Sequence, residues 1–334
     1  MADDVLNSLL KEFSQKKLKA EIDLDKRKNL LYSRIPKLQD IDDTINKCAI
    51  EKTKSILNKT STDISDLKNR IEFLTLQKAR VLSENNIDYN YLKPYYDCNI
   101  CNDTGYITNL DYTSTMCSCL KQKLLDISFN KSNMYNLKKE NFSTFNPNIF
   151  SNEVDLAKYK QNISPRSNII NIQKRCVNFI ENFDNSNTKN LLFCGNTGLG
   201  KTFMSNCIAG ELMKKGKTVL YQTAPVLIDS IIDYKMNRNK DKAENILKSV
   251  LDVDLLIIDD LGTESLNSMK LSELFTIINT RILNFNNKPT KTIISTNLNI
   301  KDIFRNYEER IGSRIVGYYD IYYFFGDDLG FKNK

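Results

Sequence analysis

The sequence predicts an α/β fold in which a helical, zinc-stabilised N-terminal domain precedes a core built on a parallel five-stranded sheet. Three observations lead to this prediction. The first ninety residues contain no glycine and repeat apolar side chains at helical spacing. Four of the eight cysteines cluster between residues 98 and 119. Beyond about residue 169, short β-rich runs alternate with amphipathic helical segments, the pattern of a parallel sheet covered on both faces.

Length and composition narrow the class of protein. The chain has 334 residues, enough for two domains with separate cores, and its 41% hydrophobic and 27% charged content is typical of a globular protein. No run of about 18 apolar residues occurs and "MADDVLNSLLKEF" does not resemble a secretory signal, so we expect a cytoplasmic protein without a membrane segment. A net charge of +7 is compatible with a polyanion partner, although solvated lysines explain most of it. Histidine is absent, which excludes histidine-based acid–base chemistry and mixed Cys/His metal sites.

Residues 1–90 are predicted to be a helical, coiled-coil-like region that binds a partner. One seam is interrupted at Lys78, and Pro36 predicts a kink or a new helix start within an earlier seam. The stretch around Thr60 predicts a turn with an N-cap. Because the seams are short, an intramolecular hairpin is favoured over an intermolecular coiled coil, and a docking surface for another protein is the alternative. The seams are Leu31, Ile35, Leu38, Ile45 and Cys48, then Ile64, Leu67, Ile71, Leu74 and Val81.

The clustered cysteines predict a metal site in residues 91–129. Cys98, Cys101, Cys117 and Cys119 have the spacing Cys-x2-Cys-x15-Cys-x-Cys, which supplies four thiolates to one tetrahedral ion. In a reducing compartment such a cluster favours a structural zinc ion, with an iron–sulfur cluster or a redox pair as alternatives. A closed four-cysteine site has no open coordination position, so we expect no catalysis there.

Residues 130–168 are predicted to be a polar linker, and residues 169–334 to be an ATPase domain. Its sheet is expected from five β-rich runs, which are "NLLFC" (190–194), "KTVLYQT" (217–223), "DLLIIDD" (254–260), "KTIISTN" (291–297) and "DIYYFF" (320–325).

The stretch "GNTGLGKT" matches the phosphate loop G-x-x-x-x-G-K-[ST] and lies between an apolar strand and a helical run. Its glycines let backbone amides surround phosphate oxygens at a helix N-terminus. Lys201 is expected to neutralise the β- and γ-phosphates of ATP, and the Thr202 hydroxyl to ligate Mg²⁺. The predicted nucleotide-binding residues are Gly195, Asn196, Thr197, Gly198, Leu199, Gly200, Lys201, Thr202 and Phe203.

Two further strand ends carry polar side chains suited to ATP hydrolysis. Asp259 is the expected Mg²⁺ partner, and Asp260 the carboxylate that polarises the attacking water, with Glu264 as a less favoured substitute. Asn297, after the next strand, is expected to hold the lytic water and sense the γ-phosphate. Arg314, rather than Arg310, is our choice for an arginine finger that reaches a neighbouring subunit. Ordinary surface arginines, or a salt bridge with Glu308 or Glu309, are the alternatives.

In this order the motifs resemble those of the AAA+ ATPases, and within them of the DnaC/DnaI helicase-loader family with its transposon relative IstB. The resemblance covers roughly residues 138–327. The matching stretches are "ENFSTFN", "GNTGLGKT", "VLYQTAPVLIDSI", "DLLIIDDLGTE", "IISTN" and "ERIGSRIVG". Upstream, "CNICNDTGYI" and "CSCLKQ" resemble the amino-terminal region of the Gram-positive loader branch.

The resemblance implies an ATP-dependent loader that binds the hexameric replicative helicase through residues 1–125 and places it on single-stranded DNA. It implies a slow, partner-stimulated ATPase that uses Mg²⁺, and self-association through the AAA+ domain. The positions carried over are Lys201, Thr202, Asp259, Asp260, Asn297 and Arg314. An IstB-like transposition helper and a zinc-stabilised ATP-binding adaptor with little turnover are the alternatives.

The chain also departs from the family pattern. Relatives often carry an arginine near the position of Gly330, and none is present here, so no nucleotide-sensing role is carried over. Only about ten residues follow "DIYYFF", which fits a small core without a helical lid. For DNA contact, the resemblance points to the segment after the second strand, where a solvated helix end is the alternative. Its basic residues are Lys235, Arg238, Lys240 and Lys242.

Overall fold

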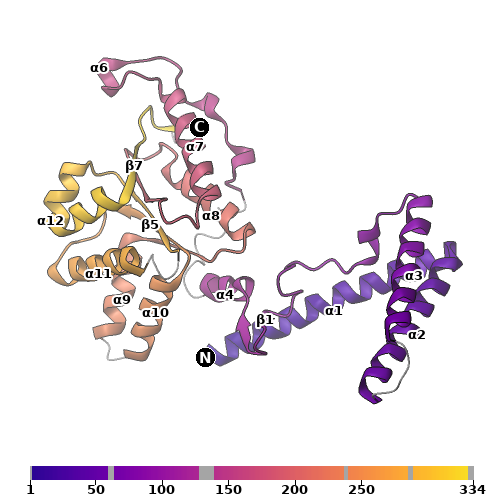
Figure 1. Cartoon of the computed structure of the whole chain (residues 1–334). Helices are drawn as coiled ribbons and strands as arrows, with labels where there is room; N and C mark the ends of the chain where they lie inside the picture. Colours follow the sequence, from indigo (N-terminus) through magenta and orange to yellow (C-terminus); the bar gives the residue numbers. More distant parts are fainter. Residues whose placement is uncertain (1, 59–63, 128–138, 237–239, 285–288, 330–334) are drawn as a thin grey trace. The chain divides into compact units, whose positions relative to one another are not determined.

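The computed structural model describes residues 2–58, 64–127, 139–236, 240–284 and 289–329 (Figure 1). The chain forms two compact units, residues 1–117 and residues 118–334. The first unit is helical, and the second is an α/β unit around a single sheet. No helix in the described ranges is long and apolar enough to cross a membrane.

Three long helices, α1 (Ala2–Arg34), α2 (Pro36–Asn58) and α3 (Ile64–Glu84), build most of the first unit. Pro36 begins a new helix, as one of the two predicted outcomes, because proline lacks an amide hydrogen and fits the first turn of a helix. The turn predicted around Thr60 lies outside the described residues.

Helices α2 and α3 pack on each other as an intramolecular hairpin. The interruption of the later seam is explained by an ion pair, since the Lys78 ammonium lies 2.6 Å from Asp42 Oδ1 at the edge of the packed face. Tyr32 of α1 donates a hydrogen bond to the same carboxylate at 2.6 Å. The buried side chains of this small core are Leu31, Leu38, Ile41, Val81 and Leu82.

The segment that follows α3 is tied back to α1 by Arg27. Its guanidinium lies 4.0 Å from the ring centroid of Tyr95 and donates hydrogen bonds to the carbonyls of Tyr91 and, at 3.1 Å, Lys93. Tyr91 belongs to a single 3₁₀ turn, η1 (Tyr89–Leu92). An antiparallel hairpin of β1 (Tyr106–Thr108) and β2 (Ser114–Met116) then ends the unit.

The second unit contains the predicted five-stranded sheet, which confirms the fold class. All neighbouring strands are parallel, in the order β4-β5-β6-β3-β7. The strands are β3 (Asn190–Cys194), β4 (Val219–Thr223), β5 (Leu255–Leu261), β6 (Lys291–Thr296) and β7 (Tyr319–Tyr323). Strand β6 therefore lies between the strand that precedes the phosphate loop and the strand that carries the two aspartates.

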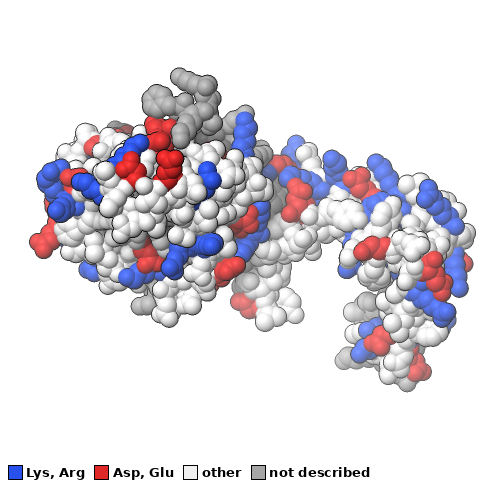
Figure 2. All heavy atoms as spheres, turned by 90° about the horizontal axis from the view of Figure 1, so that it is seen from above, with Lys and Arg blue, Asp and Glu red and all other residues white. Residues whose placement is uncertain are grey.

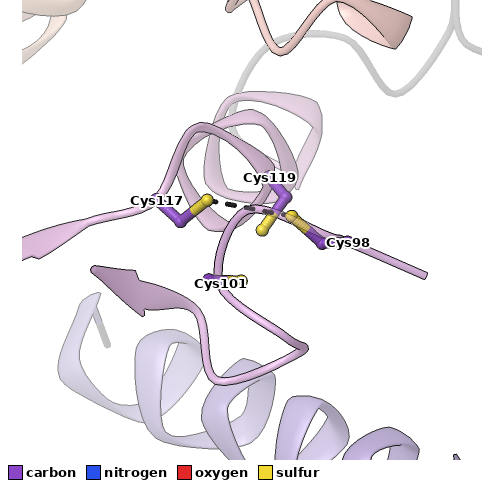
Figure 3. Close-up of side chains that lie close together, drawn as sticks. All are labelled: Cys98, Cys101, Cys117 and Cys119. Atoms are coloured by element: carbon purple, nitrogen blue, oxygen red, sulfur yellow. Dashed lines mark hydrogen bonds between the residues drawn. The ribbon is translucent and has the colours of Figure 1, made fainter. Parts of the chain in front are cut away.

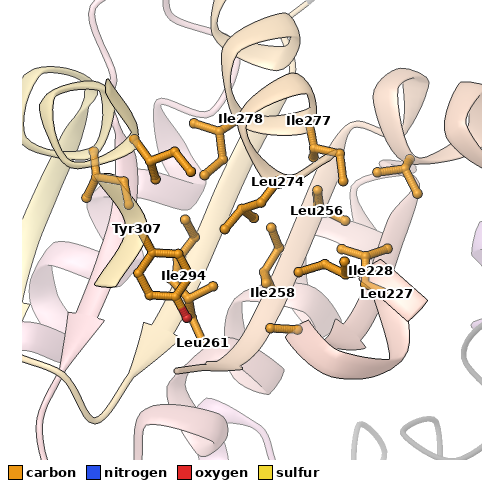
Figure 4. Close-up of a cluster of buried hydrophobic side chains, with 14 of the residues drawn as sticks. Leu227, Ile228, Leu256, Ile258, Leu261, Leu274, Ile277, Ile278, Ile294 and Tyr307 are labelled. Carbon is orange, nitrogen blue, oxygen red and sulfur yellow. The ribbon is translucent and has the colours of Figure 1, made fainter. Parts of the chain in front are cut away.

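Helices cover both faces of this sheet. On one face, Leu256 and Ile258 of β5 pack against α9, α11 and α12, as Figure 4 shows. On the other face, the alternate residues Leu255 and Ile257 pack in the core formed with α7 and α8. The helices are α4 (Ser118–Leu125), α6 (Leu156–Tyr159), α7 (Pro165–Glu181), α8 (Lys201–Lys214), α9 (Ala224–Met236), α10 (Lys240–Asp252), α11 (Ser268–Asn284) and α12 (Ile300–Tyr318).

A buried arginine joins the start of the sheet to the helices. The guanidinium of Arg281 on α11 donates to the carbonyls of Val250, Val253 and Lys291 at 2.8, 2.9 and 2.6 Å, and burial lowers its pKa to about 10. These carbonyls terminate α10 and begin β6. Because a buried cation is stable only when its donors are satisfied, these bonds fix the spacing of the three elements.

The edge strand β4 is covered by α4. The amide side chain of Gln122 donates to the Val219 carbonyl at 2.9 Å, and the Val219 N–H donates to Gln122 Oε1 at 2.7 Å. The side chain thereby takes the place of a neighbouring strand at this residue.

Much of the predicted linker has defined structure. Two 3₁₀ turns, η3 (Phe142–Thr144) and η4 (Pro147–Ile149), precede α6, and α7 begins at Pro165. The structure divides the chain between Cys117 and Ser118. The predicted domain boundaries near residues 90, 129 and 168 stay predictions.

Candidate functional site

The phosphate loop connects β3 to α8 at the carboxyl edge of the sheet. Its first glycine, Gly195, has a φ of 144°, and an added Cβ would lie 2.2 Å from the carbonyl oxygen of Phe324. Only glycine combines this backbone angle with so close an approach. The Gly195 N–H donates to the Thr296 carbonyl at 3.1 Å, and the Leu329 N–H donates to the Gly198 carbonyl at 3.1 Å. The loop is therefore held by β6 and by the segment after β7.

Lys201, the first residue of α8, is buried, with 5% of its surface exposed. Its ammonium donates to the carbonyls of Gly195 and Asn196 at 2.6 and 2.7 Å, and to Asn297 Oδ1 at 2.8 Å. Burial lowers its pKa, and the carboxylates of Asp260 and Asp259 act in the opposite direction. The lysine and the asparagine predicted to act together thus lie in direct contact.

Asp259 lies at the end of β5, directly beside the phosphate-loop helix. The Thr202 hydroxyl donates to its Oδ2 atom at 3.1 Å. The Tyr221 hydroxyl also donates to Oδ2, and the Ser295 hydroxyl donates to Oδ1. Burial, followed by the charge of Asp259, raises the pKa of Tyr221, so the phenol stays a hydrogen-bond donor.

Asp260 occupies a bulge in β5. The pairing register shifts between Ile258 and Leu261, and Asp260 has a left-handed φ of 56°. Aspartate tolerates this backbone better than most residues. Burial and the neighbouring carboxylate of Asp259 raise the pKa of Asp260. The bulge turns the Asp260 side chain out of the sheet alternation and into the cavity beside the phosphate loop.

A cavity of about 520 Å³ lies over the phosphate loop. Thr197, Lys201, Thr202 and Asp260 contribute polar groups to its lining. Phe145, Phe150, Ile169 and Leu329 contribute apolar side chains, from the segment before α7, from α7 and from the segment after β7. A cavity lined by both polar and apolar, partly aromatic, side chains suits a nucleotide, which combines charged phosphates with an aromatic base.

The predicted arginines do not line this cavity. Arg310 lies 2.9 Å from the carboxylate of Glu308, and its guanidinium is 4.7 Å from the ring centroid of Phe275. Arg314 lies one turn further along α12 with its guanidinium 5.9 Å from the ring centroid of Tyr318. Both are on α12, whose buried side chains pack on the face of the sheet opposite to α7 and α8. An action on the nucleotide of a second subunit stays a prediction.

Glu264, the less favoured substitute for Asp260, makes its contacts outside the cavity. Its Oε2 atom accepts a hydrogen bond from the Gly262 amide at 3.0 Å, and its Oε1 atom accepts one from the Tyr307 hydroxyl. The side chain is buried and does not line the cavity. Its contacts make it a connection between the end of β5 and α12.

The predicted DNA-binding residues are only partly described. Lys235, at the end of α9, forms an ion pair with Glu273 at 2.6 Å. Arg238 and Gly330 lie outside the described residues, and Lys240 and Lys242 belong to the start of α10. On the face in Figure 2, lysines and arginines are interspersed with acidic residues.

The four clustered cysteines come together, as Figure 3 shows. Their Sγ atoms all lie within 4.8 Å of one another, and those of Cys98 and Cys117 are 3.9 Å apart. Four sulfurs around one zinc ion at the usual bond length are about 3.8 Å apart, so this donor set fits a tetrahedral ion. The Gly105 amide donates to Cys101 Sγ at 3.3 Å, and Asp103 accepts from the Cys98 amide at 2.9 Å. These bonds orient the ligand loop.

Sequence reasoning missed three hydroxyl groups at the nucleotide site. Tyr221 and Ser295 contact Asp259, and Thr296 donates to the Leu261 carbonyl at 2.6 Å. Their positions follow from the strand order, which no local pattern specifies. The one available signal was that Ser295 and Thr296 directly precede Asn297 at a strand end.

A phosphate loop between strand and helix, with a lysine, an asparagine and an acidic pair converging on it, defines a P-loop nucleotide-binding protein. The family model of IstB-like ATP binding proteins matches residues 138–309, just over half of the chain. The chain belongs to this family.

Relatives include the replicative helicase loader DnaC of Escherichia coli K12, 27% identical over 146 residues, which are 44% of this chain and 57% of that protein. DnaC of Buchnera aphidicola subsp. Baizongia pistaciae is 33% identical over 86 residues, 26% of this chain and 35% of the relative. A crystal structure of the DnaC helicase loader has a TM-score of 0.43 and 22% identity, covering 57% of this chain and 99% of that one. The resemblance to DnaC-type loaders is confirmed, whereas membership of the Gram-positive branch stays a prediction.

The geometry of Gly195 gives a prediction with a matched control. Replacing Gly195 with alanine places a methyl group against the Phe324 carbonyl, and we expect a loss of about 1–3 kcal/mol of unfolding free energy together with weaker nucleotide binding. Gly210 lies in α8 with nothing within 4 Å of an added Cβ, so Gly210→Ala should stabilise the unit by about 0.5–1 kcal/mol. Denaturant unfolding and titration with a fluorescent ADP measure both effects. Equal shifts for the two variants would contradict the steric account.

Proposed function

We propose that the protein is an ATPase that loads a replicative DNA helicase onto single-stranded DNA. The observation that carries the proposal is the contact of Lys201 with Asn297, beside Thr202 and the two aspartates, at the carboxyl edge of three neighbouring strands. Such an arrangement surrounds the γ-phosphate of a bound nucleotide with the groups that hydrolysis requires.

The donor set beside the phosphate loop fits Mg²⁺. Thr202, Asp259 and Asp260 offer hydroxyl and carboxylate oxygens, the hard ligands that this ion prefers. When bound with ATP, the ion neutralises charge on the phosphate oxygens. Thr202 would ligate it directly, while Asp259 orients the Thr202 hydroxyl through their hydrogen bond.

The remaining residues act on phosphate and water. Lys201 would exchange its bonds to the loop carbonyls for bonds to phosphate oxygens, and its contact with Asn297 would keep the amide close to the γ-phosphate. Asp260, turned into the cavity, would accept a hydrogen bond from the attacking water. Arg314 of a neighbouring subunit is proposed to stabilise the transferred phosphoryl group, which requires self-association through this unit.

The N-terminal unit is proposed to bind the helicase. The names of the DnaC relatives supply this partner, and the described N-terminal helices present apolar side chains that their own core leaves exposed. Phe73 and Leu76, on one face of α3, are 60% and 70% exposed. Neighbouring apolar side chains exposed on one helix are typical of a protein interface.

A structural zinc ion is proposed to hold the cysteine cluster together. The sulfur separations fit zinc, and four thiolates leave the ion no position for a substrate.

A second candidate function is that of an IstB-like ATPase that acts on target DNA and assists a transposase. The family match favours it, because the matching model describes IstB-like proteins. The cysteine cluster and the long helices of residues 1–117 lie outside the matched range and leave the loader as the preferred proposal.

Hydrolysis is tested with two variants of the nucleotide site. We expect Lys201→Ala to lose both nucleotide binding and turnover, because Lys201 is the one cation among the described residues that line the cavity. Asp260→Asn should keep nucleotide binding and lower kcat about 100-fold or more, the usual contribution of a general base. Lys214→Ala, at the exposed end of α8, is the control.

Turnover of Asp260→Asn at the normal rate would remove Asp260 from the mechanism. A full-length protein that hydrolyses no ATP in the presence of helicase and DNA would favour a binding adaptor.

Metal content tests the zinc proposal. The purified full-length protein should contain about one zinc ion per chain by mass spectrometry, and Cys119→Ser should lose most of it. Cys48→Ala, which removes a buried thiol outside the cluster, should retain the zinc. Iron in place of zinc, or full zinc retention in Cys119→Ser, would contradict the assignment.

Helicase capture tests the loader itself. Immobilised full-length protein should retain the replicative helicase of its own cell in an ATP-sensitive complex. The double variant Phe73→Asp, Leu76→Asp should lower this retention about tenfold or more, since charges replace an apolar contact. Leu283→Asp, on α11 and 61% exposed, is the control in the other unit. Retention of a transposase and not of the helicase would support the second candidate.

A further inference from the structure

The carboxylate of Asp259 receives an unusual number of hydrogen bonds. Oδ2 accepts from Thr202 at 3.1 Å and from Tyr221, and Oδ1 accepts from Ser295 and, at 3.1 Å, from the Asp260 amide. The two hydroxyls outside the phosphate loop come from β4 and β6, the strands on either side of β5. The carboxylate is thus held from both sides of its own strand.

Tyr221 reaches Asp259 along the sheet. It pairs with Ile257 of β5, two residues before the aspartate, and its side chain extends past that pair to the strand end. Only 3% of Tyr221 is exposed, and its ring packs in the core beneath the phosphate-loop helix. The hydroxyl therefore has a fixed position that does not depend on solvent or on a mobile loop.

Ser295 forms hydrogen bonds with both aspartates. Because β5 bulges after Ile258, the Asp260 amide has left the regular β5–β6 ladder, and it donates to the Ser295 hydroxyl oxygen at 3.1 Å. The same hydroxyl donates its hydrogen to Asp259 Oδ1. One side chain thus replaces a missing ladder contact and orients the carboxylate beside it. Neither Tyr221 nor Ser295 lines the cavity.

We propose that Tyr221 and Ser295 are positioning residues for the Mg²⁺–nucleotide complex. They fix the rotation of the Asp259 carboxylate, so that it presents an oxygen to Thr202 and to water bound on the metal. Ser295 also holds the backbone turn that directs Asp260 into the cavity. The proposal rests on the ATPase function proposed above and extends it to two residues that touch neither nucleotide nor metal.

Tyr221 and Ser295 affect metal binding because they preorganise the Asp259 carboxylate. A carboxylate that has lost one of its four donors has more accessible orientations, and only some of them support the metal complex. Asp259 is the outer hydrogen-bond partner of Thr202 and of metal-bound water, and loss of such a partner typically lowers metal affinity about 10-fold to 100-fold. A loosened Asp259 should therefore cost about the lower end of that range. Affinity for nucleotide without metal should change little, because the phosphate loop and the apolar part of the cavity are unaltered.

The test compares Tyr221→Phe and Ser295→Ala with the full-length protein, using Mn²⁺ as a spin probe in the presence of ADP. Each variant should bind Mn²⁺ about tenfold more weakly by electron paramagnetic resonance, with unchanged ADP affinity in EDTA. In ATPase assays, both should need about tenfold more Mg²⁺ for half-maximal rate. Ser295→Ala should also have a lower kcat at saturating Mg²⁺, whereas Ser295→Thr, which keeps a hydroxyl, should restore both parameters.

Two controls remove buried hydroxyls elsewhere in the unit. Tyr319→Phe alters a buried tyrosine of β7, and Ser205→Ala removes a buried hydroxyl that has no hydrogen-bond partner within the described residues. Neither should change Mn²⁺ affinity. If Ser295→Ala does not fold, Tyr221→Phe alone decides the proposal.

The outcomes separate this proposal from the function on which it rests. Unchanged Mn²⁺ affinity in both variants, with the original protein binding Mn²⁺ and ADP and hydrolysing ATP, would overturn the positioning role and leave the ATPase intact. A tenfold loss of Mn²⁺ affinity in a protein that hydrolyses no ATP would support the positioning role and contradict the ATPase function.

Discussion

One backbone hydrogen bond joins the middle of the sheet to the phosphate loop, since the Gly195 amide donates to the Thr296 carbonyl at 3.1 Å. The bond requires β6 to lie beside β3, and β6 also pairs with β5 on its other side. Glycine is needed at the start of the loop because of its φ of 144° and the nearby Phe324 carbonyl. Once β6 has this place, its last residues reach both neighbours. Ser295 contacts the acidic pair of β5, and Asn297, just beyond the strand, contacts Lys201 at the start of α8. The site is therefore assembled by the end of one strand.

The buried polar groups of this site cost folding free energy unless each of them is hydrogen-bonded. A buried ammonium or carboxylate costs several kcal/mol unless hydrogen bonds replace its water. Lys201 is compensated by three acceptors, and Asp259 by four donors. The left-handed backbone of Asp260 adds a further cost of about 1 kcal/mol or more, which the flanking strands sustain. The hydrogen bonds that compensate these groups therefore also fix the orientation of the Asp259 carboxylate beside the phosphate loop.

Local patterns in the sequence predicted the fold class, the five strands and the phosphate loop, because apolar periodicity and glycine spacing act over a few residues. They also predicted the convergence of the four cysteines, which lie within a short stretch. The contacts of Tyr221 and Ser295 were not predictable in the same way, since alternating strands and helices do not specify which strands are neighbours. The bulge at Asp260 was not predictable for the same reason, because a bulge is a shift in the pairing of β5 with its neighbour β6. The ion pair of Lys235 with Glu273 joins residues 38 positions apart and left no signal in the sequence.

The segment after the bulge extends this argument from the acidic pair to the arginine helix. Glu264 binds the Gly262 amide with one oxygen and the Tyr307 hydroxyl with the other. At Tyr307 and Glu308 the helix α12 departs from helical angles, and the arginines 310 and 314 follow this kink. The turn that sets Asp260 is thus bonded to the residue at which α12 changes direction. Since a buried carboxylate with both oxygens engaged is expensive to displace, Glu264 holds the segment after β5 against α12 at the residue where the arginine-bearing half of that helix begins.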